Sequence, residues 1–222
     1  GFTPNFGNCM NKNKAIAIGL ASSVFLSLSL LFNDPALAHH PSGGEIPGNF
    51  IEGFLSGVGH PVIGIDHLVF VIAIGLLAAL SNKLGLIIPT TFVVATAVGT
   101  VIHLQSIDLP GAELIISASV LVIGIFLAQR NQANFALITI AAAIAGIFHG
   151  YAYGESIIGA EATALGAYLF GFCSIQFVIS AIAFYLGQKV LNQPHKSALL
   201  LRFAGFTVCG IGFAFLSNAL FG

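Results

Sequence analysis

Two imidazoles and a carboxylate lie at the start of a long apolar segment of this sequence. His60, Asp66 and His67 open a run of apolar residues that extends to about Leu80. Ionisable side chains are costly inside a bilayer, and they usually face the interior of a helix bundle or a water-filled path. Imidazole and carboxylate groups together suit divalent ions such as Ni(II), Co(II) and Zn(II). These three side chains are therefore the first candidates for a metal site.

The spacing of His60 and His67 limits how they can act together. In an unbroken helix the two side chains would share a face but lie about 10 Å apart along the axis, whereas one metal ion holds its ligands at about 2 Å. Either Gly59, His60 and Pro61 form a bent segment, or the two imidazoles are successive sites on a path. Pro61 fits the first turn of a helix, where its missing N–H is harmless. Asp66 could bind the same ion or orient an imidazole as a hydrogen-bond acceptor, and a purely structural pair between helices is the alternative.

A second histidine candidate ends a polar stripe. Thr96, Thr100 and His103 follow one another at spacings of four and three residues, so they share one face of a predicted helix. The two hydroxyls could instead bond back to carbonyls of their own helix, as is common in membrane helices. We interpret His103 as a supporting ligand.

A third candidate, His149, stands within a repeat of small residues. Gly146, Gly150 and Gly154 recur every four residues, which is typical of close packing between membrane helices. His149 and Glu155 are therefore expected beside a tight helix contact, where they could bind an ion. Three further candidates complete the set: Glu161, His39 and His40.

The composition is that of a membrane protein. Of 222 residues, 57% are hydrophobic and 7% are charged, whereas a soluble domain carries about 25% charged residues. The net charge of −1, without a basic run, gives no reason to expect a nucleic-acid partner. The three cysteines form no disulfide framework. Because the sequence has neither an H-E-x-x-H helix nor a Gly-rich phosphate-binding loop, it predicts neither a zinc protease of the usual kind nor an ATP-driven step.

The N-terminal region has the pattern of a secretory signal peptide. Residues 1–9 are interpreted as an upstream extension, and residues 10–38 contain a basic start, an apolar run and an Ala-Leu-Ala cleavage site. We expect cleavage after Ala38, with an uncleaved anchor helix as the alternative. Residues 39–222 are then predicted to form an all-α membrane domain, a bundle of six transmembrane helices. These six segments are about 60–81, 84–104, 111–129, 133–150, 162–187 and 198–220.

The basic residues predict the orientation of these segments. They follow the first, third and fifth segments or lie just inside the sixth: Lys83, Arg130, Lys189, Lys196 and Arg202. The connections 39–59, 105–110 and 151–161 contain no Lys or Arg. Because loops on the cytoplasmic side are enriched in Lys and Arg, the mature N-terminus and the C-terminus are both expected outside. The membrane is expected to be the plasma or inner membrane of a bacterial-type cell.

The first motif resembles that of the HupE/UreJ family of nickel and cobalt permeases. The family pattern is His, five residues, then Asp-His before a leucine-rich run, and His60, Asp66 and His67 match it position by position. The family's second motif, F-H-G-x-A/V-H-G-x-E, is matched at Phe148, His149, Gly150, Ala152 and Gly154. Tyr153 stands where that motif has its second His, and Ser156 stands where it has Glu.

This resemblance implies a secondary permease that takes up Ni(II) or Co(II) from the outer side, as a transported substrate rather than a permanently bound cofactor. Its partners would be the metal ion and the lipid bilayer, with a homo-oligomer or a membrane complex left open. We expect no enzyme activity. Two alternatives stay open: an intramembrane zinc-dependent hydrolase, and a structural subunit of a larger membrane complex whose histidines serve as hydrogen-bond partners or pigment ligands.

Overall fold

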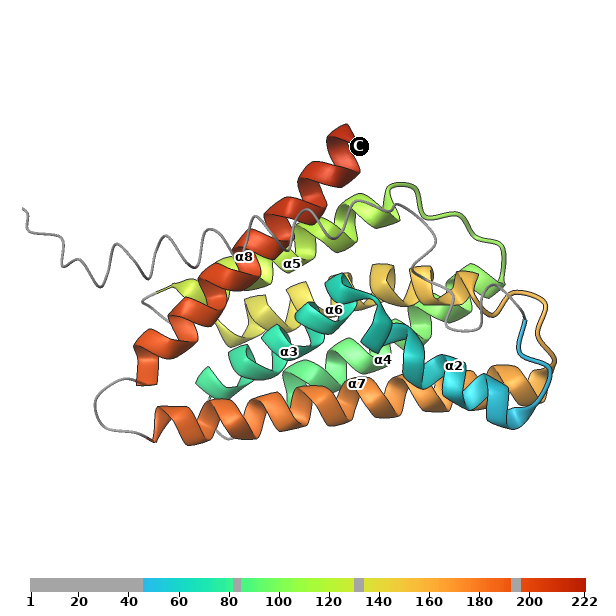
Figure 1. The fold of residues 1–222 in the computed structure, drawn as a ribbon, viewed down its shortest axis with the longest axis horizontal. Coiled ribbons are helices and arrows are strands. Elements are labelled where there is room, and N and C mark those ends of the chain that lie inside the picture. Colours follow the sequence, from blue (N-terminus) through green and yellow to red (C-terminus); the bar gives the residue numbers. More distant parts are fainter. Residues whose placement is uncertain (1–45, 82–84, 130–133, 193–196) are drawn as a thin grey trace, which may run out of the picture. The chain divides into compact units, whose positions relative to one another are not determined.

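The computed structural model describes residues 46–222 apart from 82–84, 130–133 and 193–196. These residues form helices and no strand (Figure 1). The helices are α2 (Phe50–Ile63), α3 (Ile65–Leu80), α4 (Ile87–Leu104), α5 (Ala112–Ala128), α6 (Phe135–Glu155), α7 (Ala162–Leu191) and α8 (Ser197–Phe221). The predicted extension 1–9, the predicted signal peptide 10–38, His39 and His40 lie outside the described residues, as do Lys83, Arg130 and Lys196.

The all-helical class predicted from the sequence is confirmed for this part of the chain. Helices α4, α5 and α8 lie within a few residues of the expected segments. Helix α6 continues from the expected end at 150 to Glu155, and α7 continues from 187 to Leu191. The extra turn of α6 contains Gly154, and the missing side chains of Gly150 and Gly154 let α6 pack directly on α4.

Helix α2 starts about ten residues before the segment that the sequence predicts. Its first turn is capped: the Asn49 side chain accepts a hydrogen bond from the Glu52 N–H at 3.0 Å. The Glu52 carboxylate in turn accepts from the Asn49 amide at 2.7 Å and from the Gly48 N–H at 2.8 Å. This reciprocal pattern resembles a capping box, which satisfies backbone donors that have no partner inside the helix.

The prediction of one helix over 60–81 is wrong, because the chain breaks at Gly64. Pro61 lies inside α2, near its end, and not in the first turn of a new helix. Gly64 adopts an extended conformation with φ −70° and ψ 103°, and α3 continues at an angle of 79° to α2. Proline removes a backbone donor from the last turn of α2, and a Cβ at position 64 would lie only 2.7 Å from Cδ2 of His67. The bend therefore separates the two predicted ligands onto different helices.

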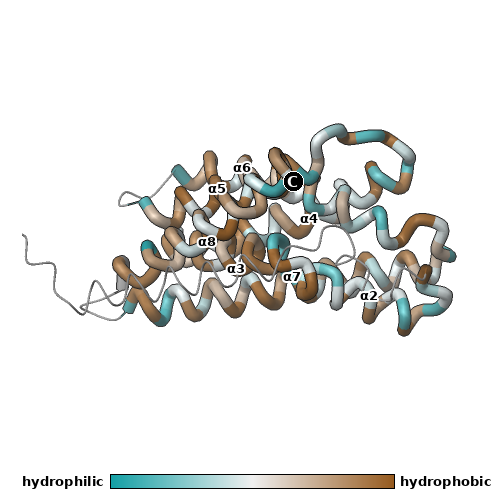
Figure 2. Tube along the Cα trace, turned by 45° about the horizontal axis from the view of Figure 1, so that its top comes forward, coloured by the Kyte–Doolittle hydropathy of each residue, from teal (hydrophilic) through white to brown (hydrophobic). Residues whose placement is uncertain are grey.

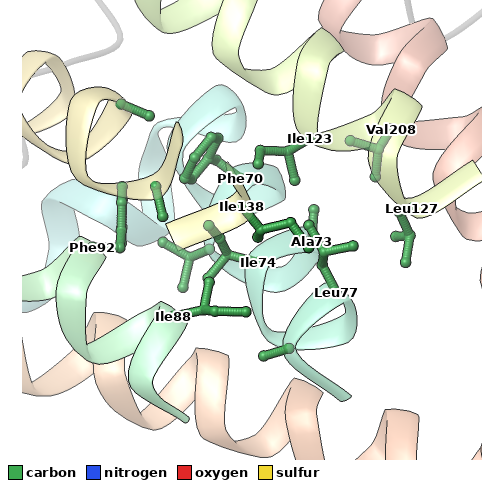
Figure 3. Packing of buried hydrophobic residues seen from close by; sticks show 14 of the residues in the cluster. Phe70, Ala73, Ile74, Leu77, Ile88, Phe92, Ile123, Leu127, Ile138 and Val208 are labelled. Carbon is green, nitrogen blue, oxygen red and sulfur yellow. The ribbon is translucent and has the colours of Figure 1, made fainter. Parts of the chain in front are cut away.

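Helix α3 lies at the centre of the packing. It contacts α2, α4, α5, α7 and α8. Its side chains Phe70, Ile74 and Leu77 are almost completely buried, and they form the main core with residues from α4, α5 and α6 (Figure 3). A helix that is apolar all round is expected in an interior, so the carboxylate and imidazole at its start are placed inside the protein.

Glycines bring the backbones of neighbouring helices into contact. A Cβ at Gly150 would overlap the carbonyl oxygen of Thr96, and a Cβ at Gly99 would overlap that of Ile147, so α4 and α6 touch directly. Gly57 makes the same kind of contact with the Tyr168 carbonyl, between α2 and α7. The close packing predicted from the glycine repeat in α6 is confirmed.

Four of the described helices are long and apolar enough to cross a membrane: α4, α6, α7 and residues Leu199–Phe221 of α8. The bent pair α2 and α3 would make a fifth span, while α5 is apolar but has 17 residues. Hydrophobic colour extends along the helices, and hydrophilic colour is found mainly near the turns (Figure 2). Large apolar side chains such as Val94, Ile140 and Phe170 are about 60% exposed, which a lipid environment explains. The protein is an integral membrane protein.

Candidate metal site

Three of the predicted ligands, His60, His67 and His149, meet in the interior of the described helices. Their side chains are 3%, 2% and 0% exposed. The ring centroids of His60 and His67 are 6.0 Å apart, and those of His67 and His149 are 4.8 Å apart. Of the two sequence hypotheses for the histidine spacing, the bent segment is the one observed, with the bend at Gly64 rather than at Gly59–Pro61.

Hydroxyl groups surround His60. Its Nδ1 lies 3.0 Å from Oγ of Ser156 and 3.2 Å from the hydroxyl of Tyr168. Tyr168 donates to the carbonyl oxygen of Tyr153 at 2.8 Å, and Ser156 can donate to the same carbonyl at 3.1 Å or to the Tyr168 oxygen at 2.9 Å. When their hydrogens are used in this way, the two oxygens can only accept, so His60 donates from Nδ1–H. The lone pair of the neutral imidazole is then on Nε2.

His67 and His149 share one hydrogen bond. Their Nδ1 atoms are 2.8 Å apart, so one of the two nitrogens donates and the other accepts. Ser119 donates to the carbonyl of Ile116 at 2.6 Å, and its Oγ lies 3.0 Å from Nε2 of His149. Since the serine hydrogen is used, His149 carries its proton on Nε2, accepts at Nδ1, and receives the Nδ1–H of His67. His67 therefore has its lone pair on Nε2, as His60 does.

Aromatic rings pack around the histidines. Tyr153 is 0% exposed, and its ring centroid lies 4.9 Å from that of His60 and 4.6 Å from that of His67. Its hydroxyl is buried and finds no hydrogen-bond partner among the residues described. Phe70 and Phe92 pack against the ring of His149. The rings exclude bulk solvent, so the cluster is a buried polar site surrounded by apolar groups.

Asp66 lies next to this cluster, at the start of α3. Its Oδ1 accepts a hydrogen bond from the backbone N–H of His67 at 2.9 Å, and its side chain is partly buried. A carboxylate in the first turn also interacts favourably with the positive end of the helix dipole. Asp66 therefore orients the backbone that carries His67, and its negative charge is available to a cation at the same place.

The other candidates lie away from the three histidines. The His103 ring packs on Tyr151 with centroids 4.3 Å apart, and the Cβ of His103 lies where a side chain at position 154 would have to be. The Nδ1 of His103 is buried and has no hydrogen-bond partner among the described residues. Glu155, the last residue of α6, and Glu161, just before α7, are both exposed. The structure thus places His60, His67 and His149 together and leaves His103, Glu155 and Glu161 at the periphery.

No group of three or more His, Cys, Asp or Glu side chains within the described ranges is arranged to hold one metal ion. The hydrogen bond between His67 and His149 uses a nitrogen of each ring. For both rings to bind one ion, that bond would have to open and the rings would have to turn. A site that must rearrange in this way differs from a structural metal centre, in which protein ligands fill every coordination position of the ion.

Sequence reasoning missed two partners of the histidines, Tyr168 and Ser119. Tyr168 is four residues before Phe172 and eight before Gln176, so these buried side chains share one face of α7. Ser119 is a hydroxyl inside an apolar segment. A polar group at such a position is a weak signal, which a search for groups facing the bundle interior could have used.

The fold and the buried histidine cluster define a class: an integral membrane protein with a polar site enclosed between helices. Residues 26–215 match the HupE / UreJ protein family, and the chain therefore belongs to the HupE/UreJ family. It is 28% identical over 183 residues to the protein named Protein HupE of Rhizobium leguminosarum bv. viciae, which covers 82% of this chain and 91% of that protein. No solved structure matches the chain.

The HupE/UreJ family is one of nickel and cobalt permeases, which are transporters rather than enzymes. Membership supports a role in metal transport and confirms the expectation that the protein is not an enzyme. The alternative of an intramembrane zinc-dependent hydrolase is therefore set aside.

Proposed function

We propose that this protein is a secondary uptake permease for a divalent transition metal, Ni(II) or Co(II). The ion would be received by His60, Asp66, His67 and His149, with His103 and Glu155 as supporting ligands. Glu161, His39 and His40 would meet the ion first, on the outer side. The observation that carries this proposal is the break at Gly64, which brings His60 and His67 into one buried cluster with His149.

The chemistry of the cluster favours capture followed by release. Three imidazoles gathered next to the Asp66 carboxylate suit borderline divalent cations. The hydroxyls of Ser156 and Tyr168 hold the Nδ1 side of His60, and such outer partners fix the orientation of an imidazole ligand. Opening the His67–His149 hydrogen bond costs free energy at each binding event, so the ion is held less tightly than in a closed site. A carrier needs this property.

The proposal includes a six-span topology with a cleaved signal peptide. The bent pair α2–α3 and the short helix α5 would complete the set of spans with α4, α6, α7 and α8. Lys189 in the last turn of α7 and Arg202 near the start of α8 would lie on the cytoplasmic side. The mature N-terminus, the C-terminus and the opening of the site would face outward, in the plasma or inner membrane.

Uptake of radiolabelled Ni(II) and Co(II) tests this function directly. Cells that lack their own high-affinity carriers would express the wild type, His67→Ala or Asp66→Asn, with membrane levels measured in each. We expect uptake by the wild type, loss to background in His67→Ala, and a decrease of about tenfold in Asp66→Asn, because a group that orients a ligand contributes roughly tenfold or more.

His195→Ala is the matched control, because His195 follows Pro194 in the connection after α7, which would lie on the cytoplasmic side in this proposal. It should transport as the wild type does. If a well-expressed wild type took up neither metal, the permease would be rejected. The remaining alternative, a structural subunit, would then predict co-purification with a larger membrane complex and mutants that are indifferent to metal.

A further inference from the structure

A buried amide lies inward of the histidine cluster, on the face of α7 that Tyr168 begins. Gln176 is 0% exposed, and it follows Phe172 by one helical turn. The Phe172 ring packs on Tyr153, with centroids 5.3 Å apart, and Tyr153 packs on His67. Gln176 therefore lies about one turn deeper than the layer of aromatic rings that surrounds the histidines.

The hydrogen bonds of Gln176 fix the orientation of its amide. Nε2 lies 3.0 Å from the carbonyl oxygen of Phe172, which can only accept, so this end of the amide must be the NH₂ group. Nε2 also lies 3.4 Å from Oγ1 of Thr96, whose own hydrogen is donated to Val93 at 2.8 Å. Both contacts require a donor on Gln176. Gln176 on α7 therefore makes a hydrogen bond to Thr96 on α4, as expected for a polar residue buried between membrane helices.

The other end of the amide has no partner. Oε1 of Gln176 is buried, and no donor among the described residues reaches it. A buried carbonyl without a donor is unfavourable, and native proteins rarely keep one without a reason. An apolar residue of the same length would avoid this cost. The position is therefore suited to a donor that arrives from outside the chain.

We propose that Oε1 of Gln176 is the next acceptor inward of the histidines, and that it binds the water shell of a partly hydrated divalent cation. Water bound to a divalent cation is polarised and is a strong hydrogen-bond donor. A neutral amide oxygen holds such a shell without the strong attraction of a carboxylate, so the ion can leave again. This inference rests on the proposed transport function, and it assigns a second site on the same path.

Two substitutions at Gln176 test the proposal by uptake kinetics of radiolabelled Ni(II) in the full-length protein. Gln176→Met keeps the length of the side chain and removes the whole amide, that is, the Oε1 acceptor together with the Nε2 donor to Phe172 and Thr96. We expect its maximal uptake rate to fall about tenfold, because the hydrogen bond from the polarised metal-bound water is lost, while Ni(II) binding to the purified protein stays within about twofold of the wild type. Gln176→Glu replaces the neutral acceptor with a group that can carry charge, which should hold the ion longer. Its KM and its maximal rate should then both decrease.

Ser180→Ala is the matched control, since Ser180 is the next polar residue along the same face and its hydroxyl is satisfied by the Phe177 carbonyl. Wild-type kinetics are expected. The proposal is overturned if Gln176→Met transports as Ser180→Ala does, or if Gln176→Glu leaves KM unchanged, since a purely structural amide would not move KM. If Gln176→Met failed to fold, the KM of Gln176→Glu would decide. Failure of the permease itself is distinct, because the wild type would then show no uptake.

Discussion

The hydroxyl groups around the histidines decide which ring nitrogen carries a proton. Ser156 and Tyr168 take the Nδ1 side of His60, and Ser119 takes Nε2 of His149. When these hydroxyls donate to backbone carbonyls, the lone pairs of His60 and His67 fall on Nε2, the nitrogen remote from the backbone. The sequence motif supplies the imidazoles, but Ser119 on α5, Ser156 just after α6 and Tyr168 on α7 contact their ring nitrogens. Without these hydroxyls, the rings could present either nitrogen.

Two tyrosines in this site should respond differently to the loss of a hydroxyl. Tyr168 donates to the Tyr153 carbonyl at 2.8 Å and also contacts Ser156 and His60, so Tyr168→Phe removes at least one buried hydrogen bond, worth about 1 kcal/mol. The expected decrease in Tm is about 2–4 °C. Tyr153→Phe removes a hydroxyl that has no partner among the described residues, and its Tm should be unchanged or higher. Thermal unfolding in detergent, followed by circular dichroism, measures both.

The wild type and the two phenylalanine variants form a matched set, because each variant removes a single oxygen atom. A decrease in Tm for Tyr153→Phe, without one for Tyr168→Phe, would contradict the hydrogen-bond assignment. It would mean that the Tyr153 hydroxyl is the one with a stabilising partner.

The break between α2 and α3 creates the site from two ends of helices. Discontinuous helices are typical places for ion binding in transporters, because their ends present polar groups at membrane depth. Here the end of α2 contributes His60, and the start of α3 contributes Asp66 and His67. A straight helix would hold the two imidazoles about 10 Å apart along its axis.

Gly64→Ala should disturb the site while leaving most of the fold intact. The φ of −70° at Gly64 is accessible to alanine, so backbone strain is not the reason for glycine here. The reason is space, because the new Cβ would lie 2.7 Å from Cδ2 of His67. We expect Ni(II) uptake to fall about tenfold at normal membrane levels, since ligand orientation contributes roughly that much.

Gly166→Ala, on α7, is the control for this substitution. A Cβ at Gly166 would meet no atom within 4 Å, and alanine is the better helix former. Its uptake should equal that of the wild type. Uptake by Gly64→Ala at the wild-type level would show that the tight contact with His67 does not position the ligand.

The sequence predicts the helices well and the break poorly. Apolar residues continue across Gly64 almost without interruption, so hydropathy indicates one segment and carries no information on direction. The cap at Asn49 and Glu52 was readable, and it would have placed the start of α2 correctly. Ser119 gave only a weak signal, and its pairing and that of Tyr168 were not readable, because they lie 30 and 108 residues from the histidines they contact. One sequence contains no direct record of such distant pairs.

Charge and chemistry lie at opposite ends of the described helices. The histidine cluster is at the start of α3, whereas Gly187, just before Lys189, packs on Ala79 near the end of α3. At that same far end the Arg202 side chain donates to the carbonyl of Ala128, the last residue of α5, at 3.0 Å. A cation is favourable at the C-terminal end of a helix, and basic residues favour the cytoplasmic side. This arrangement supports the orientation proposed above.

Single cysteines at the two ends test that orientation. Ile107→Cys lies in the connection between α4 and α5, and Asn192→Cys lies at the end of α7; both positions are exposed. In spheroplasts, a membrane-impermeant maleimide should label Ile107→Cys and not Asn192→Cys, whereas both should react after detergent lysis. The wild type gives the background from its own three cysteines. Of these, Cys173 and Cys209 are half-buried within α7 and α8. The reverse labelling would place the histidine cluster on the cytoplasmic side. The same residues would then receive ions from inside the cell, and the protein would export the metal instead of taking it up.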